Sequence, residues 1–326
     1  MKNRRFIPNT PIHVCRRPKN RSAIFYCLED CLVFFTVFCV NAKRFRVRVL
    51  GLALMYDHVH DTVQTEAKEW LSSFQRRVAT DFSIEYYQDL YSGSGQDIPR
   101  HSLFEIPFKS APKVGAKNIR SNLAYLYNNP VERHIKERAI EWRWNFLAYS
   151  LSNHPFSEKL VLRESSRRMR KAIAEVHGSL SRNEPLRYAQ LRRLFDGLDK
   201  KERLQLIDHI ISKYNVIDYS CLVKYYGSVS NAILAIDSNT GSEYDIVEER
   251  YNTPDLAYGE MIRFVEVNKI VQRAKDVVLL PLDRRKELKW LLMRETSADE
   301  WQVSKFLWLD LPPRRKNRGS YPVKNQ

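Results

Sequence analysis

Along the first 150 residues, apolar and polar positions follow two different periods, which predicts that strands and helices alternate. Apolar side chains recur at every second position in 11–17 and 44–55, a spacing typical of half-buried strands. Between them, 28–43 is apolar on nearly every turn and begins with acidic residues, as expected for a buried helix. Residues 57–64, DHVHDTVQ, predict the next strand.

The alternation continues with a long helix, a loop and a second helix. Residues 66–88 have apolar side chains at helical spacing, among them Trp70, Phe74, Val78 and Phe82. The stretch 92–101 contains glycine and proline and predicts a loop, and 102–110 predicts an edge strand that a proline interrupts. Residues 116–135 predict a helix that Pro130 kinks or ends.

Beyond residue 150 the strand pattern fades and helical periods remain. The predicted helices are 165–180, 185–198, 199–214, 218–237, 254–278, 281–295 and 297–310. This change predicts a mixed first domain over 1–150, an all-α domain over 151–311 that binds DNA or a partner, and a basic, disordered tail over 312–326. The fold class expected from the sequence is therefore α+β.

The chain carries a large excess of positive charge. Its 326 residues include 54 Lys and Arg against 38 Asp and Glu, a formal net charge of +16 with an isoelectric point of about 9.6. This charge favours a nucleic-acid partner over general solubility or an anionic membrane surface. The basic stretch 43–49, KRFRVRV, is either a strand with a solvated face or a strand that follows a phosphate backbone.

Three further features concern the compartment. The longest apolar run, 31–40, has about ten residues, whereas a membrane-spanning helix needs about 20. The first residues show no apolar core of a signal peptide. The five cysteines lack the spacing of a disulfide framework, which predicts reduced thiols. We expect a cytoplasmic protein without membrane association.

Two pairs of residues carry the candidate chemistry. His58 and His60 are two positions apart on a predicted strand, so both imidazoles leave the same face while Val59 points into the core. Tyr125 and Asn129 are four positions apart and share one face of a predicted helix. Two imidazoles and an amide oxygen are candidate ligands of a divalent cation, which would assist a weakly nucleophilic phenol. Taken alone, such histidines are more often ordinary polar-face residues, and Tyr125 would by default be a core residue.

The sequence around these residues resembles the single-tyrosine HUH transposases. Residues 55–60, MYDHVH, are similar to the MPNHVH stretch of that family. Residues 124–150, AYLYNNPVERHIKERAIEWRWNFLAYS, resemble the Y-x-x-x-N-P-V segment and the tryptophan-rich stretch of its REP-associated tyrosine transposase branch. PIHVCRRPKNRSAIF and SLFEIPFKSAP also fall where the family has its first strand and the segment before its tyrosine helix. The resemblance covers about residues 10–150.

The resemblance implies a ferredoxin-like HUH catalytic domain with an antiparallel sheet, which cuts and rejoins single-stranded or hairpin DNA through a 5′-phosphotyrosine intermediate. By matching position, it implies that Tyr125 is the nucleophile, that His58 and His60 bind Mg²⁺ or Mn²⁺, and that Asn129 is a further ligand. Tyr127 is the competing tyrosine, but its offset of two residues directs it to a different side of the helix. A second copy of the chain, in a homodimer, is a further candidate partner.

The chain departs from the family pattern at two acidic positions. Tyr56 and Asp57 stand in place of the family's Pro-Asn, and Asp61 replaces an apolar residue after the second histidine. On a regular strand both carboxylates point away from the histidines. These departures suggest one alternative, a domesticated, catalytically weak protein that binds DNA hairpins. Residues 283–315 suggest another, a transcription regulator, since they resemble a helix-turn-helix in outline with Ser297 as a helix cap.

Overall fold

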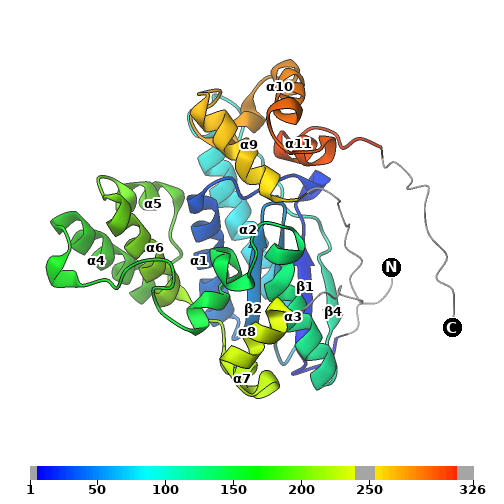
Figure 1. The fold of residues 1–326 in the computed structure, drawn as a ribbon, viewed down its shortest axis with the longest axis vertical. Coiled ribbons are helices and arrows are strands. Elements are labelled where there is room, and N and C mark those ends of the chain that lie inside the picture. Colours follow the sequence, from blue (N-terminus) through cyan, green and yellow to red (C-terminus); the bar gives the residue numbers. More distant parts are fainter. Residues whose placement is uncertain (1–5, 239–253, 314–326) are drawn as a thin grey trace.

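A four-stranded antiparallel sheet lies at the centre of the molecule (Figure 1). The structure is a computed structural model, and it describes residues 6–238 and 254–313. The strands lie in the order β2-β3-β1-β4, with bounds β1 Ile12–Arg16, β2 Arg48–Met55, β3 His58–Gln64 and β4 Lys109–Pro112. No strand follows β4 in the described residues, and the α+β class predicted from the sequence is confirmed.

Two long helices connect the strands. The chain runs β1-α1-β2-β3-α2-β4, with α1 Leu28–Arg44 and α2 Lys68–Tyr91. A two-residue turn, Tyr56 and Asp57, joins β2 to β3. The apolar stretch of α1 is buried almost throughout, as its sequence predicts.

Side-chain alternation gives the sheet two faces. Val14, Leu52 and Val59 belong to the main hydrophobic core, together with side chains of α1 and α2. The opposite face carries His60 and, directly across from it on β1, Cys15. This second face is covered by α3, Ala116–Glu132, which contacts β2 and β3.

The rest of the chain is helical. Its α-helices are α4 Arg167–Ser181, α5 Tyr188–Phe195, α6 Lys200–Tyr214, α7 Ser220–Tyr226, α8 Val229–Asp237, α9 Leu256–Val267, α10 Leu282–Glu295 and α11 Glu300–Phe306. Short 3₁₀ turns are η1 Lys19–Arg21, η2 Ala139–Glu141, η3 Arg143–Asn145, η4 Leu147–Ser150, η5 Leu162–Glu164 and η6 Ala274–Leu279. In Figure 1, α4–α6 form a lobe beside α1, α7 and α8 lie against α3, and α9–α11 gather at one end of α2.

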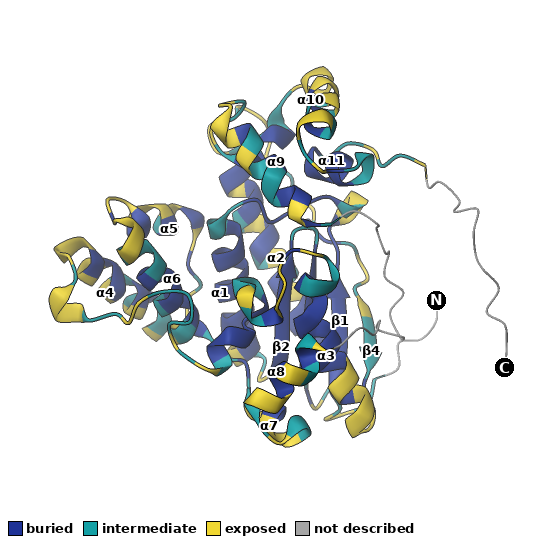
Figure 2. Ribbon diagram, in the orientation of Figure 1, coloured by how far each residue is buried: buried dark blue, intermediate teal, exposed yellow. Residues whose placement is uncertain are grey.

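One hydrophobic core joins the two halves of the chain (Figure 2). Leu32 of α1, Leu206 of α6 and Val303 of α11 belong to the same cluster of buried side chains. The division at residue 150 remains a prediction, since a shared core neither defines nor excludes two domains.

A buried ion cluster also links the halves. Lys275 of η6 is 1% exposed, its Nζ lies 3.0 Å from Asp30 Oδ1 of α1, and it also pairs with Asp89 of α2. Its ammonium lies 4.0 Å from the centre of the Tyr188 ring. A buried lysine needs such partners because an unpaired charge in the interior is costly.

Several element boundaries differ from the sequence-based expectations. The edge strand is β4, which begins after Pro107 instead of spanning it. The helix expected over 218–237 is broken at Gly227, whose φ of 84° lies in the left-handed region. Pro130 lies inside α3, which continues past it to Glu132 and ends before residue 135. The tail expected over 312–326 lies almost entirely outside the described residues.

Two global expectations can be compared with the described chain. None of its helices combines the length and the apolar character needed to cross a membrane. None of the five cysteines, all of which lie in the described residues, is in a disulfide, and four of them are buried.

Candidate functional site

Two histidines lie side by side on β3, on the sheet face that α3 covers. The ring centres of His58 and His60 are 4.8 Å apart. Val59, between them, is buried in the core on the opposite face. Strand alternation therefore brings both imidazoles to one face, as the sequence predicts.

The helix α3 carries Tyr125 over this pair. The Tyr125 ring centre lies 5.6 Å from that of His60, and Tyr125 is 4% exposed. One turn earlier, Asn122 donates from Nδ2 to Thr62 Oγ1 of β3 at 2.6 Å, which holds α3 against the strand. Asn129 follows Tyr125 by one turn on the same helix face and is also buried.

A third histidine, not expected from the sequence, joins the site from β1. His13 Nε2 lies 2.9 Å from His60 Nδ1, and the two rings share a hydrogen bond. The His13 ring centre is 5.8 Å from that of Tyr125. His13 is opposite Thr62 in the β1–β3 register, so its side chain is on the histidine face. The sequence does contain a histidine on the first predicted strand, but no local pattern predicts that β1 lies beside β3.

Asp57 contacts the site directly, which corrects the expectation that it points away. It belongs to the turn before β3 and not to the strand, so strand alternation does not apply to it. His58 Nδ1 lies 2.6 Å from Asp57 Oδ1. Because an ionised carboxylate can only accept, His58 carries its proton on Nδ1 and donates it to Asp57.

The ammonium of Lys305 in α11 binds the other oxygen of Asp57. Lys305 is 3% exposed and comes from the far end of the chain. Burial alone would raise the pKa of Asp57, but Lys305 and His58 together hold the pKa of that carboxyl well below its usual range. The second half of the chain thus supplies a residue that neutralises Asp57.

Asp61 faces the other side of the sheet, as expected. It accepts a hydrogen bond from Gln75 Nε2 of α2 at 2.9 Å, and Gln75 also binds Arg16. Burial raises the pKa of Asp61 to about 7, although Arg16 and Gln75 act to lower it. Asp61 is therefore part of the core beneath the sheet, and its side chain does not lie on the histidine face.

Tyr127 is directed away from the histidines. Its hydroxyl donates to Leu50 O of β2 at 3.1 Å, and it is completely buried. Burial raises the pKa of Tyr127 well above its ordinary value. Of the two tyrosines on α3, only Tyr125 contacts the histidine face.

This face presents nitrogen and oxygen atoms of the kinds that bind divalent cations. Since Nδ1 of His58 faces Asp57 and Nδ1 of His60 faces His13, a cation would be bound through Nε2 of each histidine. The buried Oδ1 of Asn129 accepts no hydrogen bond from the described residues, and it is a candidate third donor. The described ranges contain no cluster of three His, Cys, Asp or Glu side chains suited to a metal, so an ion here would depend on this amide oxygen.

The whole site is closed to solvent. His13, His58, His60 and Asn129 are each at most 2% exposed. A DNA phosphate could reach Tyr125 only after part of the surrounding structure moves.

Two elements that the sequence suggested for DNA contact make contacts within the chain, and DNA contact by the basic stretch 43–49 remains a prediction. Arg48, in the basic stretch 43–49, donates from Nε to Asp218 Oδ2 at 2.7 Å. Most of α11 is buried, and its N-cap is Asp299, not Ser297. A buried helix cannot enter a major groove, so the helix-turn-helix interpretation is wrong.

Comparison with known proteins adds a distant structural relation. Neither a family model nor a curated protein matches the chain. One solved structure that matches is that of a REP-associated tyrosine transposase bound to a REP hairpin, with 15% sequence identity and a TM-score of 0.35. The match covers 44% of this chain and 80% of that one. A similarity of this size does not establish an activity, so the function must be inferred from the site itself.

Proposed function

We propose that the protein is a metal-dependent nuclease and strand transferase of single-stranded or hairpin DNA, with Tyr125 as its nucleophile. In this proposal His58, His60 and Asn129 hold Mg²⁺ or Mn²⁺. The main observation in support of this proposal is that two strand histidines and one helix tyrosine lie in contact on a buried face of the sheet. The connectivity β1-α1-β2-β3-α2-β4 with β1 and β3 central is that of ferredoxin-like domains, which supports an HUH-type catalytic domain.

In the proposed reaction the Tyr125 hydroxyl attacks a DNA phosphorus. A bond forms between Tyr125 Oη and phosphorus, and the bond from phosphorus to the 3′ oxygen breaks. The products are a 5′-phosphotyrosine and a 3′-hydroxyl, so the phenol proton is transferred, in net terms, to the leaving oxygen. A bound cation would neutralise charge that develops on the phosphate. Asp57 and His13 would hold the two histidine rings in orientation.

The closed site favours a second candidate function. A tyrosine that is 4% exposed is compatible with a protein that binds DNA hairpins through its positive surface and no longer cuts them. The transcription-regulator alternative loses its basis, because α11 is buried. A homodimer and a cytoplasmic location remain predictions from the sequence.

One experiment separates the two candidates. The full chain is incubated with end-labelled hairpin DNA and Mn²⁺, and covalent protein–DNA adducts are resolved on a denaturing gel. If the protein cleaves DNA, wild type and Tyr127→Phe should both form the adduct. Tyr125→Phe should form none, and neither should wild type in the presence of a chelator. Hairpin binding without any adduct would support the binding protein, and an adduct that persists in Tyr125→Phe would exclude the proposed nucleophile.

A further inference from the structure

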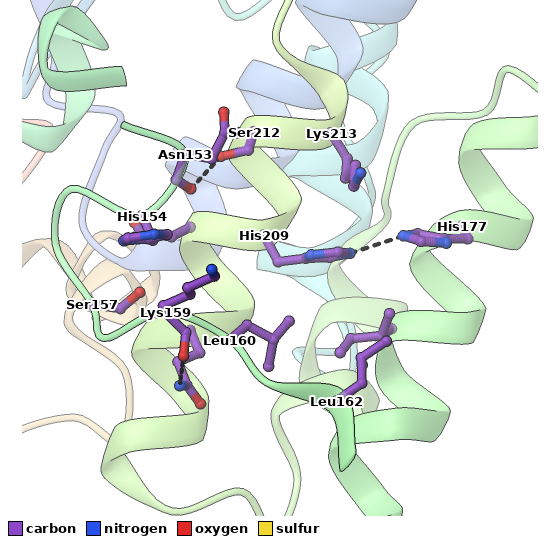
Figure 3. Close-up of a pocket in the computed structure, with 13 residues that line it drawn as sticks. Asn153, His154, Ser157, Lys159, Leu160, Leu162, His177, His209, Ser212 and Lys213 are labelled. Carbon is purple, nitrogen blue, oxygen red and sulfur yellow. Dashed lines mark hydrogen bonds between the residues drawn. The ribbon is translucent and has the colours of Figure 1, made fainter. Parts of the chain in front are cut away.

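The helical part of the chain contains a cavity that shares no residue with the tyrosine site (Figure 3). It lies between α4, α6 and the segment 153–162, and its volume is about 380 Å³. Binding sites for small molecules commonly have volumes of about 300–1,000 Å³. Leu160, Leu162 and Ile173 give the cavity an apolar wall.

Two lysines of this cavity have no acidic partner in the described ranges. Lys159 and Lys213 line the cavity, and Figure 3 shows both directed toward His209 from different sides. Lys201 of the same lobe, in contrast, has an acidic partner, since its Nζ lies 2.7 Å from Glu158 Oε2. The two ammonium groups therefore leave positive charge on the cavity wall.

The acidic side chain among the lining residues is already engaged. Asp208 accepts the Tyr149 hydroxyl at 2.7 Å and the Phe156 amide at 3.0 Å, and it pairs with Arg143. Arg143 already neutralises this carboxylate, and no ion pair joins Asp208 to either lysine in the described ranges.

Two neutral imidazoles add hydrogen-bonding groups to the cavity wall. His177 of α4 and His209 of α6 meet with their Nε2 atoms 2.9 Å apart, a distance at which one ring donates and the other accepts. Burial, together with His177 and Lys213, lowers the pKa of His209 to about 4. Burial accounts for most of this shift, and the positive charge of Lys213, which also disfavours a charged His209, would attract a bound anion.

We infer that this cavity binds a phosphorylated nucleoside. Lys159, Lys213 and an imidazole N–H would bind the phosphate, because charge-assisted hydrogen bonds to phosphate oxygens are strong. The base and sugar would pack on the apolar wall and on the histidine rings. A free mononucleotide and one nucleotide of a single DNA strand present the same chemistry, and both are tested below.

Calorimetric titration of the full chain in chelator tests the inference with three probes: dTMP, inorganic phosphate and a short oligothymidylate. We expect dTMP to bind, and inorganic phosphate to bind at least about tenfold more weakly because it cannot use the apolar wall. Lys159→Gln and Lys213→Gln should each weaken dTMP binding about tenfold or more. Lys200→Gln, an exposed position of α6 outside the cavity, is the matched control and should leave dTMP binding unchanged.

Competition identifies the source of the nucleotide. If dTMP displaces the oligothymidylate, and Lys213→Gln weakens both, the cavity holds a nucleotide of a DNA strand. If dTMP binds without displacing the oligonucleotide, the ligand is a free nucleotide. The inference is overturned if wild type binds no dTMP at millimolar concentration, if Lys200→Gln weakens binding as much as Lys213→Gln, or if phosphate binds as tightly as dTMP.

Discussion

Replacing Lys305 by Met should destabilise the protein by about 3–5 kcal/mol, the usual cost of breaking a buried ion pair from one side. The size follows from burial: Lys305 is 3% exposed and Asp57 is 13% exposed, so water cannot replace the lost ammonium. The free energy of unfolding of the full chain would be measured by urea denaturation at neutral pH. Lys289→Met is the control, since Lys289 pairs with the more exposed Glu300 and should cost only about 0–1 kcal/mol.

The double variant makes this prediction sharper. Asp57→Asn removes the carboxylate but keeps an oxygen that can accept from His58. Asp57→Asn with Lys305→Met should therefore be more stable than Lys305→Met alone, because the buried charge left without its partner is gone. If the two single changes simply add in the double variant, the two side chains are not energetically coupled and the reasoning is wrong.

The same variants report on the proposed metal site. Asp57→Asn should lower Mn²⁺ affinity about 10–100-fold, equivalent to about 1.4–2.8 kcal/mol, because residues that orient metal-binding histidines commonly have effects of this size. Calorimetric titration with Mn²⁺ measures this directly and does not depend on cleavage. Equal Mn²⁺ affinity in wild type and Asp57→Asn would refute an orienting role, whereas absence of Mn²⁺ binding in wild type would refute the metal site itself.

Three further outcomes are expected. His13→Ala should weaken Mn²⁺ binding about tenfold, since His60 loses the partner of its Nδ1, and the same titration measures this. Lys275→Met should cost about 3–5 kcal/mol in urea unfolding, because it leaves two buried carboxylates without their shared cation. For His209 the folded pKa of about 4 lies below the ordinary value of 6.5, so the unfolded chain gains a proton first as pH falls. Stability should thus decrease from about pH 6.5 toward pH 4, and this decrease should be smaller in His209→Gln when unfolding is followed across that range.

Local sequence patterns predict a large part of the site. Period-two alternation is enough to bring His58 and His60 to one face, because a strand offers only two directions. Helical spacing likewise brings Tyr125 and Asn129 to one face and turns Tyr127 away from it. These relations involve neighbours a few residues apart, which is the range that periodicity describes.

The remaining contacts could not be predicted because they depend on which distant segments meet. His13 joins the site since β1 is inserted between β3 and β4, a strand order that no periodicity encodes. Lys305 is 248 residues from Asp57 along the chain. The expected direction of the Asp57 side chain is wrong for a local reason. The strand begins one residue later, at His58, so Asp57 lies in the preceding turn and its carboxylate can contact the His58 ring.

The contacts of α11 explain how the chain accommodates a largely buried carboxylate at position 57. Ala23 donates from its amide to Lys305 O at 3.0 Å, and the Tyr26 hydroxyl donates to Phe306 O at 2.7 Å. These bonds hold α11 against the start of the chain and bring the Lys305 ammonium to Asp57. A carboxylate at position 57 would be costly if buried alone, but with the lysine it becomes one half of a paired charge that also orients His58. The carboxylate of Asp57 is therefore matched by a lysine far along the chain, and the two together form an outer support for the histidine face.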